Sequence, residues 1–172
     1  MQVAVIGAGA LGCLFGGRLA DNGHDVTLVH YRQPYVDELN QRSLRVVSDI
    51  DAIDTVKLSV LATTDAATVG PVDLALVFVK AHQTEGALCQ HAACIGPETT
   101  VLSLQNGFGH YETLCDHVGT ERALAGVTYQ GAVVEEPGVV KHTNDGISTV
   151  GGENEAAMGQ VADALADRKS VV

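Results

Sequence analysis

Basic residues are scarce in this chain of 172 residues, in which 10 Lys and Arg stand against 21 Asp and Glu, giving a formal net charge of −11. Proteins that bind nucleic acid or an anionic lipid surface need clustered lysine and arginine side chains. We therefore expect neither nucleic acid nor a membrane surface among the partners of this protein.

Long apolar runs are also missing. No stretch of the sequence approaches the roughly 20 apolar residues that a membrane-spanning helix requires. The N-terminal segment MQVAVIGAGALG has no basic region before its apolar part, and glycines interrupt it, so it does not resemble a signal peptide. We expect a cytoplasmic protein.

Cysteine is the third scarce residue type. The four cysteines, Cys13, Cys89, Cys94 and Cys115, are too scattered for a disulfide framework and are expected to be reduced. Cys89, His91 and Cys94 form the one grouping that resembles a metal site. On a helix their spacings place the three side chains on different faces, whereas zinc sites favour i, i+4 pairs or C-x-x-C loops. We expect buried thiols there and no metal.

Hydrophobic residues, by contrast, make up 46% of the chain and charged residues 18%, which is typical of a folded protein rather than a disordered one. At about 150 residues per domain, the length favours a single domain over residues 1–172. A chain of this size buries roughly 70% of its unfolded surface, which is enough for a hydrophobic core.

The apolar pattern alternates between strand and helix periods along the chain. Leu74–Val79 is apolar at every position, as expected of a central parallel strand that is covered on both faces. The alternation predicts an α/β fold with a Rossmann-like, doubly wound and mostly parallel sheet, followed by antiparallel strands at its C-terminal edge and one last helix. Strands are expected at residues 2–6, 25–30, 44–47, 56–60, 74–79, 100–104, 123–135, 139–142 and 147–150, and helices after Gly9 up to Asn22 and at 34–41, 83–94, 110–117 and 153–167.

A glycine-rich turn joins the first strand to the first helix. It reads Gly7-Ala8-Gly9-Ala10-Leu11-Gly12, the pattern G-x-G-x-x-G. Gly7 permits the tight turn, Gly9 lets the backbone approach a pyrophosphate, and Gly12 lets the helix pack closely on the strand. The anion then lies on unpaired N–H groups at the positive end of the helix. The strand-turn-helix context favours a dinucleotide site over a purely structural turn.

The residues after the second strand bear on the choice of cofactor. An NAD-preferring site places Asp or Glu about 20 residues beyond the glycine motif, where the carboxylate binds the ribose 2′-hydroxyl. Here the strand runs into His30-Tyr31-Arg32, with no carboxylate at its tip. Arg32 can donate two hydrogen bonds to a 2′-phosphate and stack on adenine. We predict NADP(H), the alternative being that Arg32 is a solvated loop residue.

Two further strands end in polar residues. Lys80 follows the apolar run of 74–79 at once, and Asn106 follows the strand expected at 100–104. Ligands of open α/β sheets bind outside the carboxyl ends of the strands, so both side chains are candidates for a substrate cleft. The alternatives are a lysine in water at the start of a helix, and an Asn106-Gly107 pair that makes a plain tight turn.

Four segments together resemble the ketopantoate reductase (2-dehydropantoate 2-reductase) family: Gly7–Gly12, Lys80–Gln83, Gln105–Gly109 and His142–Gly146. Their order and spacing are similar to the N-terminal domain of that family, and the resemblance covers nearly the whole chain. It implies reduction of the ketone of 2-dehydropantoate to pantoate with NADPH, on the route to pantothenate and coenzyme A.

The resemblance also implies roles for single residues. Gly7, Gly9 and Gly12 would hold the pyrophosphate, Arg32 the 2′-phosphate, and Lys80 and Asn106 the nicotinamide ribose and the 2-oxo acid substrate. In the family the arginine stands where this chain has Tyr31, so the role of Arg32 requires a small shift of the loop.

The family has a second, helical domain that supplies a lysine as general acid, and we expect this domain to be absent from residues 1–172. Hydride transfer to a ketone makes an alkoxide that a positioned acid must protonate, a contribution of about 10²–10⁴ in rate. The chain alone is therefore expected to bind NADPH with little turnover. The alternatives are a reductase of another 2-oxo acid, and a non-catalytic NADP-binding module that works with a helical domain in trans. The surface that such a domain would cover also favours a homo-oligomer.

Overall fold

The computed structural model of the chain describes residues 1–48, 50 and 55–166. Three aspartates that their charge predicts to lie in a solvated loop, Asp49, Asp51 and Asp54, are outside the described residues. So are the expected end of the last helix at Asp167 and the tail lysine Lys169.

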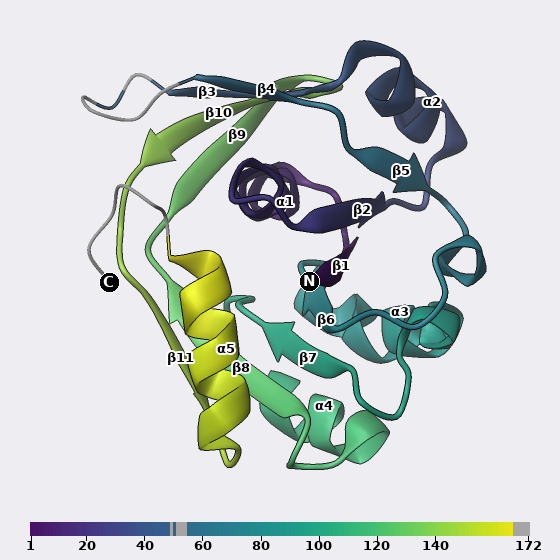
Figure 1. The fold of residues 1–172 in the computed structure, drawn as a ribbon, viewed down its shortest axis with the longest axis vertical. Helices are drawn as coiled ribbons and strands as arrows, with labels where there is room; N and C mark the ends of the chain where they lie inside the picture. Colours follow the sequence, from purple (N-terminus) through teal and green to yellow (C-terminus); the bar gives the residue numbers. More distant parts are fainter. Residues whose placement is uncertain (49, 51–54, 167–172) are drawn as a thin grey trace.

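A seven-stranded sheet forms the centre of the molecule (Figure 1). Its strand order is β11-β8-β7-β6-β1-β2-β5, and each neighbouring pair is parallel except β11 with β8. The strands are β1 (Gln2–Ile6), β2 (Asp25–Val29), β5 (Leu61–Thr63), β6 (Leu74–Val77), β7 (Thr100–Ser103), β8 (Ala123–Thr128) and β11 (Ser148–Gly152). The chain winds outward from β1 in both directions, which makes the carboxyl ends of β1 and β6 the position where open α/β sheets of this kind bind their ligands. The predicted α/β class, with a mostly parallel sheet and an antiparallel strand at its edge, is confirmed.

A second sheet of four strands has the order β4-β3-β10-β9. It consists of β3 (Leu44–Ser48), β4 (Val56–Leu58), β9 (Gly131–Glu136) and β10 (Val139–Asn144). The prediction that all C-terminal strands extend the main sheet was therefore wrong for β9 and β10. The single strand expected at 123–135 is two strands in different sheets, and the strand expected at 56–60 ends at Leu58.

The second sheet packs on the outer side of helix α1 (Ala10–Asp21), which lies between the two sheets (Figure 1). Two adjacent glycines let both sheets approach this helix. A Cβ on Gly16 would lie 2.7 Å from a methyl of Leu28 in β2, and one on Gly17 would lie 2.7 Å from a methyl of Val46 in β3. The apolar side chains of β3 thus complete the packing around α1, which local periodicity does not reveal.

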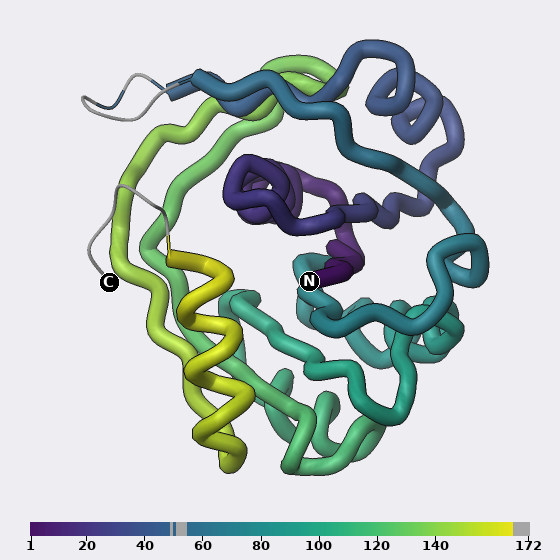
Figure 2. Tube along the Cα trace, in the orientation of Figure 1, coloured from purple at the N-terminus to yellow at the C-terminus, as the bar shows by residue number. Residues whose placement is uncertain are grey.

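The remaining helices cover the main sheet on both faces, as the trace in Figure 2 shows. They are α2 (Gln33–Arg42), α3 (Thr84–Gln90), α4 (His110–Val118) and α5 (Glu155–Leu165), with short 3₁₀ segments η1 (Ala66–Thr68), η2 (Ala81–Gln83) and η3 (Ala92–Cys94). All four residues of β6 are buried, as expected of a central strand. Leu74 and Leu76 join the core on the side of α1, whereas Ala75 and Val77 join the core on the side of α3 and α4.

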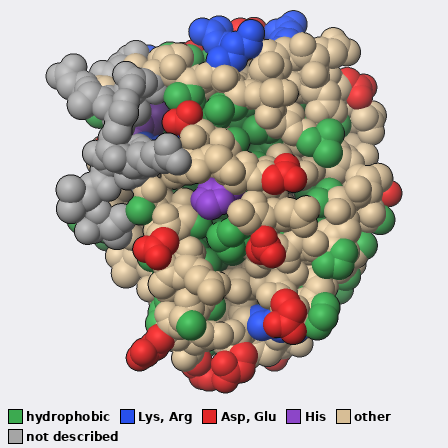
Figure 3. Space-filling model, in the orientation of Figure 1, with side chains coloured by type: hydrophobic (Ala, Val, Ile, Leu, Met, Phe, Trp, Pro, Cys, Tyr) green, Lys and Arg blue, Asp and Glu red, His purple; other side chains and the backbone are tan. Residues whose placement is uncertain are grey.

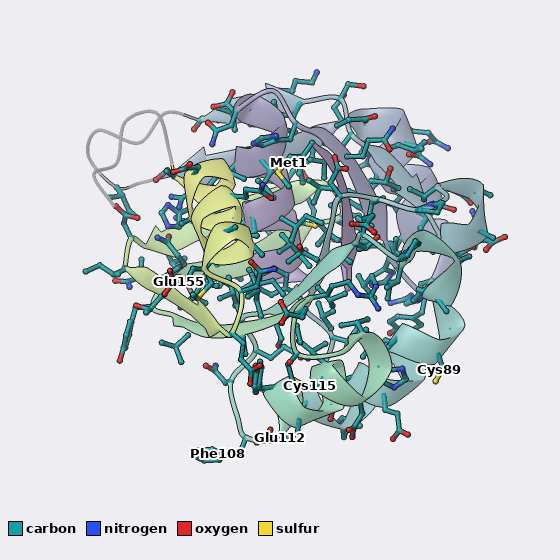
Figure 4. All side chains as sticks on the ribbon, turned by 60° about the horizontal axis from the view of Figure 1, so that its bottom comes forward. Met1, Cys89, Phe108, Glu112, Cys115 and Glu155 are labelled. Atoms are coloured by element: carbon teal, nitrogen blue, oxygen red, sulfur yellow. The ribbon has the colours of Figure 1, made fainter. Side chains whose placement is uncertain are left out.

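The two cysteines in and after α3, Cys89 and Cys94, differ in their exposure to solvent. The expectation of buried thiols is confirmed for Cys94, which donates to the backbone oxygen of His91, 3.1 Å away. It was wrong for Cys89, which is exposed and projects outward (Figure 4). Within the described part of the chain, no three His, Cys, Asp or Glu side chains are placed to hold a metal ion. The helices of residues 1–48, 50 and 55–166 include none that is long and apolar enough to span a bilayer.

Candidate functional site

The glycine turn is fastened to the neighbouring strand by backbone hydrogen bonds. The N–H groups of Gly7 and Ala8 both donate to the carbonyl of Val29 at the end of β2, at 3.0 and 3.1 Å. Gly7 has φ +104°, and a Cβ there would lie 2.7 Å from the backbone of the segment after β6. A Cβ on Gly12 would lie 2.2 Å from the carbonyl oxygen of Gly7. Gly7 and Gly12 are therefore required by the packing of the turn itself.

Gly9 differs from the other two glycines. A side chain there would meet no protein atom within 4 Å, and its φ of −84° is open to any residue. It is the N-cap of α1, and no side chain caps the helix. The first N–H groups of a helix have no intrahelical acceptor and carry the positive end of the helix dipole. The space beside Gly9 thus gives an anionic group direct access to these donors, and the turn fits a pyrophosphate.

Aromatic and basic side chains follow β2. The ring of His30 packs against those of Tyr31 and Tyr35, with centroids 4.7 and 4.4 Å apart. The backbone N–H of Arg32 donates to His30 Nδ1 over 3.2 Å. Burial lowers the pKa of His30, and the hydrogen bond from the Arg32 backbone opposes this shift in part. Arg32 is exposed, and among the described residues no carboxylate forms an ion pair with it.

The buried thiol of Cys13 forms a hydrogen bond to the glycine turn. The Cys13 thiol donates to the carbonyl of Ala8 over 3.4 Å and lies 3.8 Å from the hydroxyl of Tyr35. Burial raises the pKa of Cys13 to about 12. Cys13 is therefore a protonated structural group that links the turn to α2, as expected of a thiol in the core.

The segments that carry Lys80 and Asn106 meet at the carboxyl edge of the sheet. Lys80 is the exposed N-cap of η2, and its carbonyl accepts from the N–H of Gln83 at 2.7 Å. The carbonyl of Asn106 accepts from Nε2 of His110 at 3.0 Å, and the Asn106 side chain is exposed. A Cβ on Gly107, which has φ +118°, would be 4.0 Å from that of Ala81.

The strand order arranges the predicted site residues along one edge. Asn106 follows β7, Lys80 follows β6, the glycine turn follows β1, and Arg32 lies beyond β2. Neighbouring strands are about 4.8 Å apart, so the three spacings from β2 to β7 amount to roughly 14 Å. The edge is thus long enough for an extended ligand with Arg32 at one end and Lys80 and Asn106 at the other.

Gln105 is a polar residue of this edge to which the sequence assigned no role. Its Nε2 donates to the carbonyl of Val79, directly before Lys80. Its Oε1 accepts from the hydroxyls of Thr84 and Ser103, at 3.1 and 2.8 Å. The one signal in the sequence was the position of a glutamine between a buried strand and an Asn-Gly pair.

The segment His142–Gly146 includes the end of β10 in the second sheet and lies against α1. Nδ1 of the buried His142 accepts from Arg18 of α1 at 3.4 Å, and its Nε2 donates to Gln130 Oε1 at 2.7 Å. Arg18 also forms an ion pair with Asp145 at 3.7 Å. Burial, and after it the charge of Arg18, lowers the pKa of His142. The segment therefore fastens the end of β10 to α1.

Charge on the surface is dominated by acidic groups. On the face shown in Figure 3, acidic side chains are scattered from top to bottom, whereas the basic ones gather mainly at the top. A net charge of −11 repels a phosphate-bearing ligand at long range. Such a ligand would have to rely on local donors, and the candidates are the N–H groups of the turn and the exposed cations Arg32 and Lys80.

Comparison with known families and proteins places this geometry in context. Residues 3–155 match the ApbA family, described as ketopantoate reductase PanE/ApbA. The 2-dehydropantoate 2-reductase of Pyrococcus horikoshii is 39% identical over 159 residues, which are 90% of this chain and 50% of that protein. The corresponding protein of Halobacterium salinarum is 37% identical over 171 residues, 96% of this chain and 54% of its own length.

Solved structures share the fold over nearly the whole chain. A PanE/ApbA family ketopantoate reductase from Ralstonia eutropha has a TM-score of 0.85 at 31% identity, covering 96% of this chain and 53% of that one. A D-mandelate dehydrogenase with NADH and anilino(oxo)acetate has the same scores and coverage.

The chain spans about half the length of the relatives that it matches. The family match runs through the glycine turn, Lys80, Asn106 and the His142–Gly146 segment. Relatives above 30% identity and the Rossmann-like structures agree with it. This protein belongs to the ketopantoate reductase family.

Proposed function

We propose that residues 1–172 bind NADP(H) and form the cofactor-binding part of a 2-dehydropantoate 2-reductase. The observation that carries the proposal is the open space beside Gly9 at the start of α1, in a turn whose other glycines are closely packed. It supports a pyrophosphate on the helix N-terminus at the central crevice of the sheet.

The preference for NADP(H) over NAD(H) rests on the residues after β2. A 2′-phosphate at this end would meet the exposed guanidinium of Arg32 rather than a carboxylate. Hydrogen bonds to charged groups contribute about 1.5–3 kcal/mol, which corresponds to a preference of tenfold or more. Tyr31 and the ring of His30 offer aromatic faces for the adenine.

Lys80 and Asn106 would act at the other end of the cofactor. When bound, NADPH supplies the hydride that reduces the ketone. The ammonium of Lys80 would hold ribose hydroxyls or the substrate carboxylate, and the amide of Asn106 would hydrogen-bond the substrate. The alkoxide then needs a proton, and we assign its donor to the part of the relatives that this chain does not span.

A fluorescence titration tests this proposal. The chain has no Trp and only four Tyr, so NADPH fluorescence is observed with little protein background. We expect NADPH to bind at least tenfold more tightly than NADH, and Arg32→Ala to remove the difference. Arg42→Ala is the matched control, since Arg42 lies at the other end of α2 and pairs with Glu136. Equal affinity for both cofactors, unchanged by Arg32→Ala, contradicts the assignment.

A second candidate is a reductase of another 2-oxo acid that uses NADH. It is favoured by the similarity to D-mandelate dehydrogenase, whose structure contains NADH. Tighter binding of NADH than of NADPH would support this candidate. A third outcome is that NADPH binds and that neither Lys80→Ala nor Asn106→Ala changes its affinity. This outcome would instead favour a non-catalytic NADP-binding module.

A further inference from the structure

Gln105 joins three segments at the carboxyl edge of the sheet. Its Oε1 accepts from hydroxyl groups of Thr84 in α3 and Ser103 in β7, two residues that are 2% and 1% exposed. Its Nε2 donates to the carbonyl of Val79, which follows β6. Both ends of the amide are thus engaged, and the hydroxyl donors and the carbonyl acceptor fix which end is which.

Val79 lies between the phosphate turn and Gln105. A Cβ on Gly7 would come within 2.7 Å of the peptide that joins Phe78 to Val79, so the turn lies directly against the nitrogen side of Val79. Gln105 holds the carbonyl on the other side of Val79, in the peptide that leads to Lys80. Lys80 is the next residue after Val79, and Asn106 is the next residue after Gln105.

We propose that Gln105 is a positioning residue that sets the spacing between Lys80 and Asn106. The inference rests on the proposed function, because it concerns the end of the site assigned to the nicotinamide ribose and the substrate. The three contacts require an acceptor for two hydroxyls and a donor for one carbonyl. An amide meets both requirements, whereas a carboxylate only accepts until it is protonated.

The variant Gln105→Glu tests this requirement, because it keeps the shape and exchanges the donor for an oxygen. At pH 8 we expect its affinity for NADP⁺, measured by calorimetry, to be about tenfold below that of the wild type. A carboxylate at this position would face the Val79 carbonyl oxygen, which raises its pKa above the ordinary value of about 4.3. As the pH falls toward 5, the introduced carboxyl therefore takes up a proton, donates to Val79 and restores affinity. Affinities are compared with the wild type at each pH, because the 2′-phosphate also titrates.

Three variants serve as controls. Gln90→Glu makes the same charge change on the exposed side of α3 and is expected to match the wild type at every pH. Gln105→Met is expected to lose affinity to the same extent at pH 5 and pH 8. In a Lys80→Ala background, Gln105→Glu is expected to lower the affinity for NADP⁺ by a smaller factor than it does alone, because Gln105 is proposed to act through the position of Lys80.

Backbone NMR shifts of Lys80 and Asn106 provide a readout that requires no cofactor. In Gln105→Glu both signals should move at pH 8 and return toward their wild-type positions at pH 5. Wild-type shifts and wild-type affinity at pH 8, or equal losses at both pH values, overturn the positioning role. Restoration of the shifts in a protein that does not bind NADP⁺ keeps this role and refutes the proposed function instead.

Discussion

The contrast between Gly9 and Gly12 yields a prediction that separates binding from folding. At Gly9 a methyl group has no protein atom within 4 Å, and the backbone has φ −84°, so Gly9→Ala requires no rearrangement. The loss of glycine flexibility in the unfolded chain offsets the poorer N-cap, and the net change in the free energy of unfolding is within about 1 kcal/mol.

At Gly12 the same methyl group would lie 2.2 Å from the Gly7 carbonyl oxygen, which is more than 1 Å closer than an ordinary van der Waals contact. Because this neighbour is backbone, no rotamer change relieves the overlap, and α1 has to move away from β1. Overpacking of this kind costs about 1–3 kcal/mol, with roughly 2–4 °C in Tm for each kcal/mol in a chain of this size.

The two variants are therefore expected to respond in different assays. Gly9→Ala keeps the Tm of the wild type but places a methyl group where the pyrophosphate approaches, and NADPH binding weakens at least tenfold through lost charge-assisted hydrogen bonds. Gly12→Ala lowers Tm in thermal denaturation of the protein without cofactor. Wild-type NADPH affinity in Gly9→Ala would refute the reasoning about the turn.

Two further predictions concern acid stability and turnover. The pKa values of His24, His30, His91 and His142 are lowered mainly by burial. Because the unfolded chain takes up these protons near pH 6.5 and the folded protein only at lower pH, the free energy of unfolding should fall as the pH drops below about 7. In urea denaturation at pH 7.5 and pH 5.5, His142→Gln should reduce this loss, whereas His117→Gln, at an exposed position of α4, should not. An unchanged loss in His142→Gln would contradict the assignment of part of the acid sensitivity to the buried His142. Second, residues 1–172 alone should oxidise NADPH with 2-dehydropantoate at a rate at least about 10²-fold below that of an ordinary enzyme, because the proton donor is assigned elsewhere; ordinary steady-state rates would contradict this assignment.

The elements around β1 were predictable because their signals are local. The glycine spacing defines the turn and the start of α1, and the unbroken apolar run of Leu74–Val77 identifies β6 as a central strand. The parallel order brings the carboxyl ends of β6 and β7 together, which is why Lys80 and Asn106 lie on one edge.

Features that depend on distant partners were not predictable in the same way. The segment after β8 leaves the main sheet at Tyr129 and Gln130, and Gln130 is held by Asp145 and His142, more than ten residues away. A strand pattern gives the faces of a strand but not the sheet that it joins. Gln105 was missed for the same reason, since its acceptor Val79 is separated from it by 26 positions.

The most direct test of the central claim is an amide NMR titration of this chain with NADPH. The account predicts the largest shifts at the amides of Gly9, Ala10 and Leu11, where the pyrophosphate would lie on the start of α1, and further shifts at Arg32 and Lys80. Unchanged signals at the start of α1 on saturation with NADPH would contradict it, whatever else in the chain responds.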